Sequence, residues 1–170
     1  MTTEPDFFGI KERIVAILKD DTTNLFSATP TDKTKFRLIQ AGAPDLNKPI
    51  QGPFPRIFVT NDDDIDTMVR RGSIVSNAPK TTRHEMKFKI IFVVDGKDGP
   101  DTEEKIDDFT KLILQKLKEF SDLRNPGGAE STQLADTSFP ERITIFNRDL
   151  IGSNVQGRVI FFRVITTTGE

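Results

Sequence analysis

An alternating strand that leads almost directly into an amphipathic helix constrains the fold of this chain more than any other feature. The strand spans residues 83–94, and every second residue on one face is apolar: Met86, Phe88, Ile90, Phe92 and Val94. The opposite face begins with Glu85, Lys87 and Lys89 and ends with Ile91 and Val93. We therefore expect a strand that starts with one face in solvent and ends with both faces buried.

Two segments have the apolar periodicity of a helix. The first covers residues 5–20, where Pro5 suits a first-turn position. The second covers residues 102–121 and carries one apolar stripe: Ile106, Phe109, Leu112, Ile113, Leu117 and Phe120. Acidic residues crowd the first half of this segment and lysines its second half, an order that complements the helix macrodipole.

Shorter apolar runs predict the remaining strands, at residues 36–39, 56–60, 142–147 and 157–166. Two long segments between them, 22–54 and 61–82, are expected to be irregular, and so is the shorter segment 126–139. A structureless segment as long as 61–82 is unusual in a compact domain and is typical of a functional loop. We expect it to be mobile in the free chain and to be ordered by a partner.

These elements predict a single α+β domain over residues 1–170. The expected architecture is a small, mostly antiparallel β-sheet with two helices packed on one face and long loops. The last strand, 157–166, is apolar on both faces, so the face without helices also needs a cover. Two covers remain open: the proline-rich part of 22–54 and a neighbouring subunit.

Composition excludes several classes of protein. The chain has a formal net charge of −2 and therefore lacks the basic footprint of a general nucleic-acid binder. It has no cysteine, which excludes disulfides and cysteine-ligated metals. The N-terminus lacks a secretory signal, and no apolar run approaches the roughly 18 residues that span a bilayer. We expect a chain that is made and kept in a cytoplasm, without a membrane partner.

The acidic runs do not complete a metal site. Asp62, Asp64 and Asp66 alternate like the opening of a calcium loop, but the sixth and twelfth positions of that loop are occupied by Thr67 and Ser73. The turn at residues 95–99 places a lysine where an oxygen ligand belongs. We therefore predict no metal and no organic cofactor.

No catalytic constellation is recognisable either. His84, the single histidine, has no cysteine or serine nucleophile motif to serve, so we interpret it as a structural residue near a strand end. Arg70 and Arg71 suit contact with phosphate or with an acidic partner, although an exposed, solvated pair is the default interpretation. Arg163 interrupts an apolar strand and should pair with a carboxylate, either across the sheet or at an interface. The candidate partner-facing residues are Arg70, Arg71, Ile91, Val93 and Arg163.

The order of elements resembles that of the tail terminator (tail completion) proteins of tailed phages and related viruses. The resemblance rests on five segments: an opening helix at 7–18, a strand at 55–59, a strand at 85–94, the helix that follows it at 103–120, and a closing strand beginning at Gly157. It covers nearly the whole chain and depends on periodicity and order rather than on an invariant motif.

The resemblance implies a non-enzymatic virion protein of the tail or neck, assembled in the host cytoplasm. Such proteins form a homo-oligomeric ring, usually a hexamer, that caps the tail tube and stops its polymerisation. The ring presents a surface to the head–tail connector protein, touches sheath if the tail is contractile, and lets DNA pass through its lumen without sequence-specific binding. The alternatives are another neck component, such as a stopper or adaptor, and a small cytoplasmic enzyme with an unrecognised site.

Overall fold

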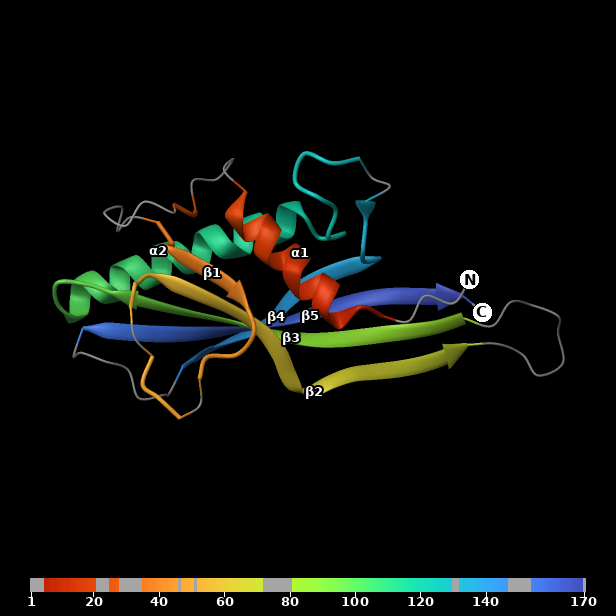
Figure 1. Ribbon diagram of the computed structural model, residues 1–170, viewed down its shortest axis with the longest axis horizontal. Helices are drawn as coiled ribbons and strands as arrows, with labels where there is room; N and C mark the ends of the chain where they lie inside the picture. The colour runs from red at the N-terminus through yellow and green to blue at the C-terminus, as the bar shows by residue number, and fades with distance from the viewer. Residues whose placement is uncertain are drawn as a thin grey trace, which may run out of the picture.

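A computed structural model describes the chain at residues 5–20, 25–27, 35–45, 47–50, 52–71, 81–129, 132–146 and 154–169. Within these ranges, two helices and five strands follow one another (Figure 1): α1 (Phe7–Lys19), β1 (Leu38–Ala41), β2 (Arg56–Arg71), β3 (Thr81–Asp95), α2 (Gly99–Glu119), β4 (Thr137–Ile145) and β5 (Val155–Gly169). The strands form one sheet in the order β1-β2-β3-β5-β4. Only β1 and β2 are parallel, so the prediction of a mostly antiparallel α+β fold is confirmed.

Helix α1 forms close to where its apolar periodicity predicts it. The side chain of Asp6 caps its start by accepting a hydrogen bond from the backbone N–H of Gly9 at 2.8 Å. The helix buries Ile10, Ile14, Val15, Ile17 and Leu18 against the sheet. Pro5 lies before the capping residue, so its expected place in the first turn is wrong.

Helix α2 begins three residues earlier than the sequence predicts, at Gly99 instead of residue 102. Asp98 caps it by accepting from the backbone N–H of Asp101 at 2.8 Å, and Pro100 occupies the first turn. The carboxylate of Asp101 accepts from the backbone N–H of Lys97 at 2.7 Å and pairs with Lys105 at 3.2 Å. The backbone hydrogen bond, followed by the contact with Lys105, lowers the pKa of Asp101 below its usual value of 3.8.

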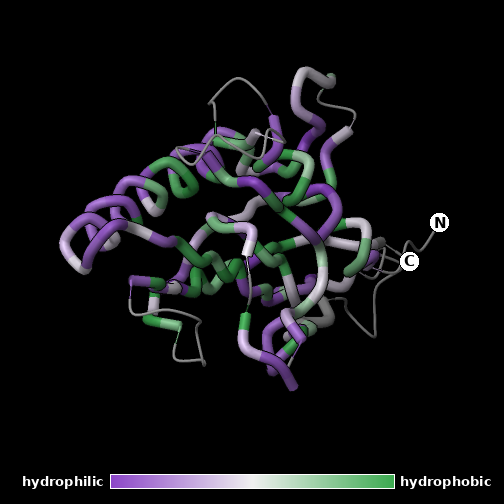
Figure 2. The backbone as a smooth tube through the Cα atoms, turned by 60° about the vertical axis from the view of Figure 1, so that its left-hand side comes forward, coloured by the Kyte–Doolittle hydropathy of each residue, from purple (hydrophilic) through white to green (hydrophobic). Residues whose placement is uncertain are grey.

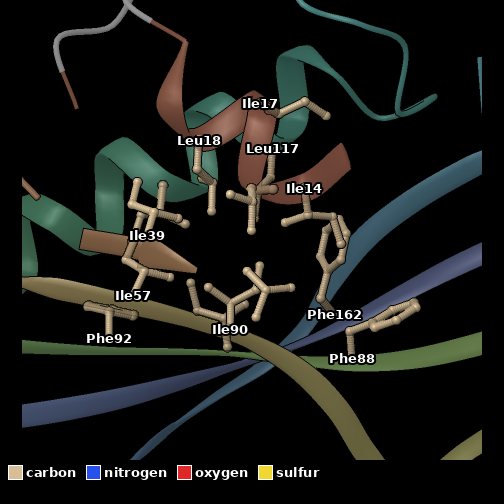
Figure 3. Packing of buried hydrophobic residues seen from close by; sticks show 14 of the residues in the cluster. Ile14, Ile17, Leu18, Ile39, Ile57, Phe88, Ile90, Phe92, Leu117 and Phe162 are labelled. Atoms are coloured by element: carbon tan, nitrogen blue, oxygen red, sulfur yellow. The ribbon is translucent and has the colours of Figure 1, made fainter. Parts of the chain in front are cut away.

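The main core lies between the two helices and one face of the sheet. In Figure 2 the hydrophobic stretches gather where the helices meet the sheet, and hydrophilic stretches lie outside. Phe88, Ile90 and Phe92 of β3 point toward Ile14, Leu18 and Leu117 of the helices (Figure 3). The predicted alternation of β3 is thus confirmed. Each such side chain contributes about 1.5–3 kcal/mol when it is buried completely.

A smaller core covers part of the face that carries no helix. Ile91 and Val93 of β3 are buried there with Phe58 and Val159. Their cover comes from the same chain, because Ile50 belongs to the cluster and Phe54 packs against it. Of the two covers that the sequence leaves open, the proline-rich segment is therefore the one found here. Ile91 and Val93 offer no exposed surface to a partner, which corrects their place among the partner-facing candidates.

The expected irregular segment 61–82 is in large part strand. Strand β2 continues to Arg71 and β3 starts at Thr81, while residues 72–80 lie outside the described part. The pairing of β2 with β3 shifts between Asn61 and Asp66, so a bulge interrupts the alternation that would reveal a strand. The aspartates of this bulge face lysines of β3, which makes an acidic run compatible with a sheet.

The boundaries of the other strands differ less from the predicted ones. Strand β1 begins at Leu38 rather than residue 36, although Phe36 forms an isolated bridge with Phe26. Strand β4 begins at Thr137, inside the segment 126–139 that we expected to be a loop, because its pairing tolerates Pro140 through a second register shift. Strand β5 is longer at both ends than the predicted 157–166.

Candidate interaction surface

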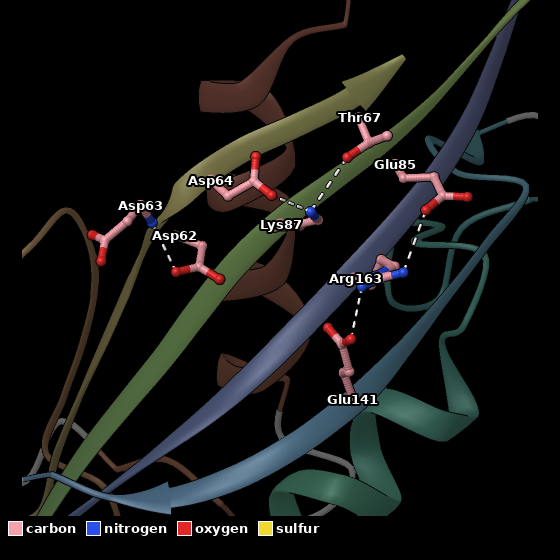
Figure 4. Close-up of polar contacts among 8 residues, drawn as sticks. All are labelled: Asp62, Asp63, Asp64, Thr67, Glu85, Lys87, Glu141 and Arg163. Atoms are coloured by element: carbon pink, nitrogen blue, oxygen red, sulfur yellow. Dashed lines mark hydrogen bonds and ion pairs between the residues drawn. The ribbon is translucent and has the colours of Figure 1, made fainter. Parts of the chain in front are cut away.

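A network of charged side chains covers the other half of the helix-free face. It is built on β3 and β5, whose side chains at alternate positions point away from the helices. Lys87 and Lys89 come from β3 and Arg163 from β5. Carboxylates of β2 and β4 lie near Lys87 and Arg163 (Figure 4). We call this set the charged face: Asp62, Asp63, Asp64, Glu85, Lys87, Lys89, Glu141 and Arg163.

Each cation of the charged face has at least one carboxylate partner. Lys87 pairs with Asp64, and Lys89 lies 3.3 Å from Asp62. Arg163 donates to Glu141 at 2.7 Å and to Glu85 at 3.3 Å. The sequence allowed Arg163 a carboxylate partner either across the sheet or at an interface. The structure shows carboxylate partners across the sheet, within the same chain. These pairs lie near solvent, so each contributes about 0–1 kcal/mol.

A surface depression of about 370 Å³ lies on the charged face. Its lining residues are Asp62, Asp63, Asp64, Lys87, Glu141, Arg142, Phe161 and Arg163. The two register shifts of the sheet, in β2 and in β4, both fall at its edges. Arg142 stacks over the ring of Phe161, 4.0 Å from its centroid. We call this feature the charged depression.

The sheet continues beyond the helices as a three-stranded arm. The arm comprises residues 66–71 of β2, 81–86 of β3 and 164–169 of β5, and Figure 1 shows it projecting past the first turn of α1. Strand β1 pairs with β2 only from Arg56 to Val59, so the edge of β2 in the arm is open within the described residues. Met68 on this edge strand is 67% exposed.

His84 lies inside the arm as a buried structural residue. Its Nδ1 is 2.8 Å from Asp66 Oδ2, and its Nε2 is 3.4 Å from the hydroxyl of Thr168. The ring thereby connects β2, β3 and β5 just after the bulge in β2. This contact agrees with the structural role that the sequence suggests for His84.

The predicted partner-facing residues do not form one site. Arg70 and Arg71 end β2 at the outer end of the arm, where their Cα partners are Thr82 and Thr81. Arg163 belongs to the charged face, and Ile91 and Val93 lie beneath the proline-rich segment. That Arg70, Arg71 and Arg163 contact a partner protein stays a prediction.

Sequence reasoning missed the exposed apolar side chains of β4. Ile145 is 74% exposed, and Ile143 and Phe139 also reach solvent. In all of β4 only Ser138 is buried, and on the side away from β5 no described strand pairs with it. An open edge strand with apolar side chains is a typical place for contact with another chain. In the sequence, only the alternation of apolar and polar residues after Pro140 could have indicated this exposed apolar edge.

The acidic residues that suggested a metal loop have other partners. Asp62 and Asp64 pair with lysines, Asp66 contacts His84, and Asp98 caps α2. In the described ranges, no three histidine or acidic side chains converge as a metal site would require. Neither α1 nor α2, the helices of the described chain, has an apolar stretch long enough to cross a bilayer.

A second depression, of about 430 Å³, lies near the end of β1. Its lining includes Arg56, whose guanidinium stacks 4.4 Å from the ring of Phe58. Burial lowers the pKa of Arg56 from its usual value. Arg13, on α1, is also partly buried and donates to the carbonyls of Leu123 and Thr132 at 2.8 and 2.7 Å, which ties that helix to the segment before β4.

Similarity to known proteins is found among solved structures. No protein-family model and no curated protein matches the sequence. Among solved structures, a chain described as "Virion of native gene transfer agent (GTA) particle" is similar at 12% sequence identity and a TM-score of 0.42. The alignment covers 94% of this chain and 94% of that chain.

Proposed function

We propose that this chain is a structural protein of the virion of a tailed phage or related virus, located in the tail or neck. Its copies form a ring, a hexamer, that caps the tail tube and terminates its polymerisation. The ring offers a docking surface to the head–tail connector protein, and to sheath if the tail is contractile. DNA passes through the lumen without sequence-specific contact, and the chain is not an enzyme.

The observation that carries this proposal is the kind of surface that the chain exposes. Its distinctive features are an open edge strand with apolar side chains, β4, and a sheet arm that projects beyond the helices. Both features suit contact between chains, because an open sheet edge presents unpaired backbone groups to a neighbour. Two different surfaces on one subunit also permit the head-to-tail contacts from which rings are built.

The fold is compatible with the resemblance that the sequence carries. A small, mostly antiparallel sheet with two helices on one face is the architecture that the resemblance to tail terminators implies. Fold alone does not specify function, so the surfaces rather than the topology support the ring. The apolar half of the helix-free face adds nothing to this argument, since the chain covers it with its own residues.

Two other functions remain as alternatives. A stopper or adaptor of the neck would share the open edges and the arm, but it would bind the connector instead of the tube. An enzyme would use one of the two depressions. The charged depression offers paired charges, and the one near β1 mixes Asp45, Lys48 and Arg56 with apolar side chains. Neither contains a recognisable arrangement of nucleophile, base and oxyanion donor.

Electron microscopy of the purified chain, mixed with tail tubes of the same virus, tests the proposal. We expect rings at tube ends, and tubes that stop growing when the chain is added during polymerisation. If the chain binds the connector protein and leaves the tube ends bare, the result would favour the neck alternative. A monomer that binds neither would contradict a virion role.

A further inference from the structure

The exposed apolar side chains of the described residues gather at the two open edges of the sheet. Strand β4 is one edge, and the other is the part of β2 that lies beyond its pairing with β1. In the described ranges, seven large apolar side chains are exposed, and five of them lie on these two edges: Phe139, Ile143 and Ile145 on β4, and Ile65 and Met68 on β2. Single exposed apolar residues are ordinary, but a concentration of them marks a surface for contact with another chain.

Beyond its register shift, β4 offers both backbone groups and apolar side chains to a neighbour. The backbone N–H of Phe146 donates to the carbonyl of Gly157 in β5 at 2.9 Å. Because the direction of hydrogen bonding alternates along an antiparallel strand, the backbone N–H and C=O groups of Ile145 and Ile143 point to the open side. The side chains of the same two residues are exposed. The register shift protects only the first half of the strand, so residues 142–145 remain open to pairing.

The free edge of β2 has a similar stretch beyond its own bulge. The bulge between Asn61 and Asp66 interrupts this edge, and its aspartates are held by lysines of β3. After Asp66 the regular pairing of β2 with β3 resumes and continues to Arg71. Met68 lies in this regular stretch, which runs along the free side of the arm in Figure 1. Two regular edges with exposed apolar side chains are therefore available on opposite sides of one sheet.

We propose that residues 66–71 of β2 in one copy pair with residues 142–145 of β4 in the next copy, so that one β-sheet continues from subunit to subunit. This inference rests on the proposed ring and names the contact that builds it. The two edges differ, so every copy gives one and receives one, as a head-to-tail ring requires. Pairing satisfies the outward backbone groups of Ile143 and Ile145 and gives their side chains and Met68 cross-strand neighbours. The arm also gains a fourth strand, which a sheet of few strands needs for stability.

Cross-linking between two variants tests the contact. Because the chain has no cysteine, Met68→Cys and Ile143→Cys each carry a single thiol. Paired strands lie only about 4.8 Å apart, so a short bis-maleimide should join the two variants in a 1:1 mixture with tail tubes. Neither variant should be joined to itself. Phe8→Cys, at a comparably exposed apolar residue of α1, should give no product with Met68→Cys. Linked dimers of Ile143→Cys alone would show that β4 pairs with β4, and would overturn the contact.

Substitutions at each edge test the same contact by assembly. Ile143→Pro removes an outward N–H and keeps the pairing with β5, since an edge strand tolerates proline where its N–H faces away from the sheet. This variant and Met68→Lys should each raise the protein concentration for half-maximal ring formation by at least about tenfold. Ile143→Val keeps the N–H and an apolar side chain, so it should assemble like the unmodified chain. Native mass spectrometry and circular dichroism report assembly and folding. Folded Ile143→Pro and Met68→Lys variants that form rings normally would overturn the contact.

The outcomes separate this contact from the proposed function. Rings on tube ends without a cross-link between the two cysteine variants would overturn the contact and leave the proposed function intact. Cross-linked rings that ignore tube ends would support the contact and count against the proposed function. A chain that stays monomeric with and without tubes would overturn both.

Discussion

At the scale of single residues, the most consequential feature is a charged side chain inside the core. Lys116 of α2 is 0% exposed, and its Nζ lies 2.6 Å from Asp20 Oδ2 at the end of α1. The ammonium also lies 5.0 Å from the centre of the Phe120 ring. A buried ion pair adds little net stability, but the loss of one partner is costly for the charge that remains. The pair joins α2 to the end of α1.

The two partners should respond unequally to substitution. Asp20→Ala removes a hydrogen-bonded carboxylate from a buried ammonium and should lower the free energy of unfolding by about 2 kcal/mol. Lys116→Met keeps the apolar stem and leaves Asp20, whose side chain is 20% exposed, in reach of water. This variant should lose only about 1 kcal/mol. Urea unfolding measures both, and an equal or reversed order would contradict the asymmetry.

At the scale of elements, the start of α2 depends on acidic side chains. Asp98 and Asp101 accept three described hydrogen bonds or ion pairs between them at the first turn. Since the pKa of Asp101 is lower in the folded chain, the unfolded chain binds more protons near pH 3.8. The stabilisation is complete above that pH and is lost as the pH falls through the folded pKa.

Asp101→Asn should therefore remove part of the acid sensitivity. Urea midpoints measured from about pH 5 downward should fall less steeply for this variant than for the unmodified chain. Asp108→Asn changes the same charge on the exposed surface of α2 and serves as the control. Equal slopes for Asp101→Asn and the unmodified chain would contradict the role of Asp101.

Strand β4 should matter for assembly more than for folding. Ile145 is 74% exposed, so Ile145→Lys should change the free energy of unfolding by less than about 0.5 kcal/mol. The same substitution places a charge on the apolar edge and should abolish ring formation on tubes. Phe8→Lys alters a comparably exposed apolar residue on α1 and should leave the rings intact. Rings of normal stability from Ile145→Lys would remove β4 from the interface.

At the scale of the whole molecule, stability is distributed unevenly. The centre of β3 is buried on both faces, whereas the arm reaches the main core only at its base, through Met86 and Val164, and Figure 1 shows no helix over its outer part. A sheet of few strands with little apolar burial is marginally stable on its own. The arm is therefore the part of the described fold that gains most from a partner.

Amide hydrogen exchange should reveal this gradient. In the free chain, residues 66–71 and 81–83 should exchange faster than residues 88–94 of β3. In the assembled ring, exchange in the arm should slow by at least about tenfold, since docking lowers the population of open states. Similar exchange of the arm in both states would show that the arm is ordered without a partner.

The sequence predicts the elements that keep one periodicity throughout. β3 buries the residues that its pattern assigns to the core, and so does α2 except for Leu112, which is partly buried. The second half of β2 could not be predicted, because the bulge between Asn61 and Asp66 breaks the alternation and aspartates are rare in strands. The start of β4 is hidden by Pro140 in the same way. The charged depression depends on both bulges and on pairing between distant strands, which no local pattern contains.

The central position of β5 has a consequence for synthesis on the ribosome. β5 pairs along the whole of β3, from Thr81 with Gly169 to Asp95 with Val155, and it is the strand with which β4 pairs. Until residues 155–169 emerge from the ribosome, β4 has no strand to pair with. The apolar side chains of β3 also lack one of the two strands that flank them. The nascent chain therefore cannot complete its core in stages. A truncated product without this strand should therefore be degraded by proteases.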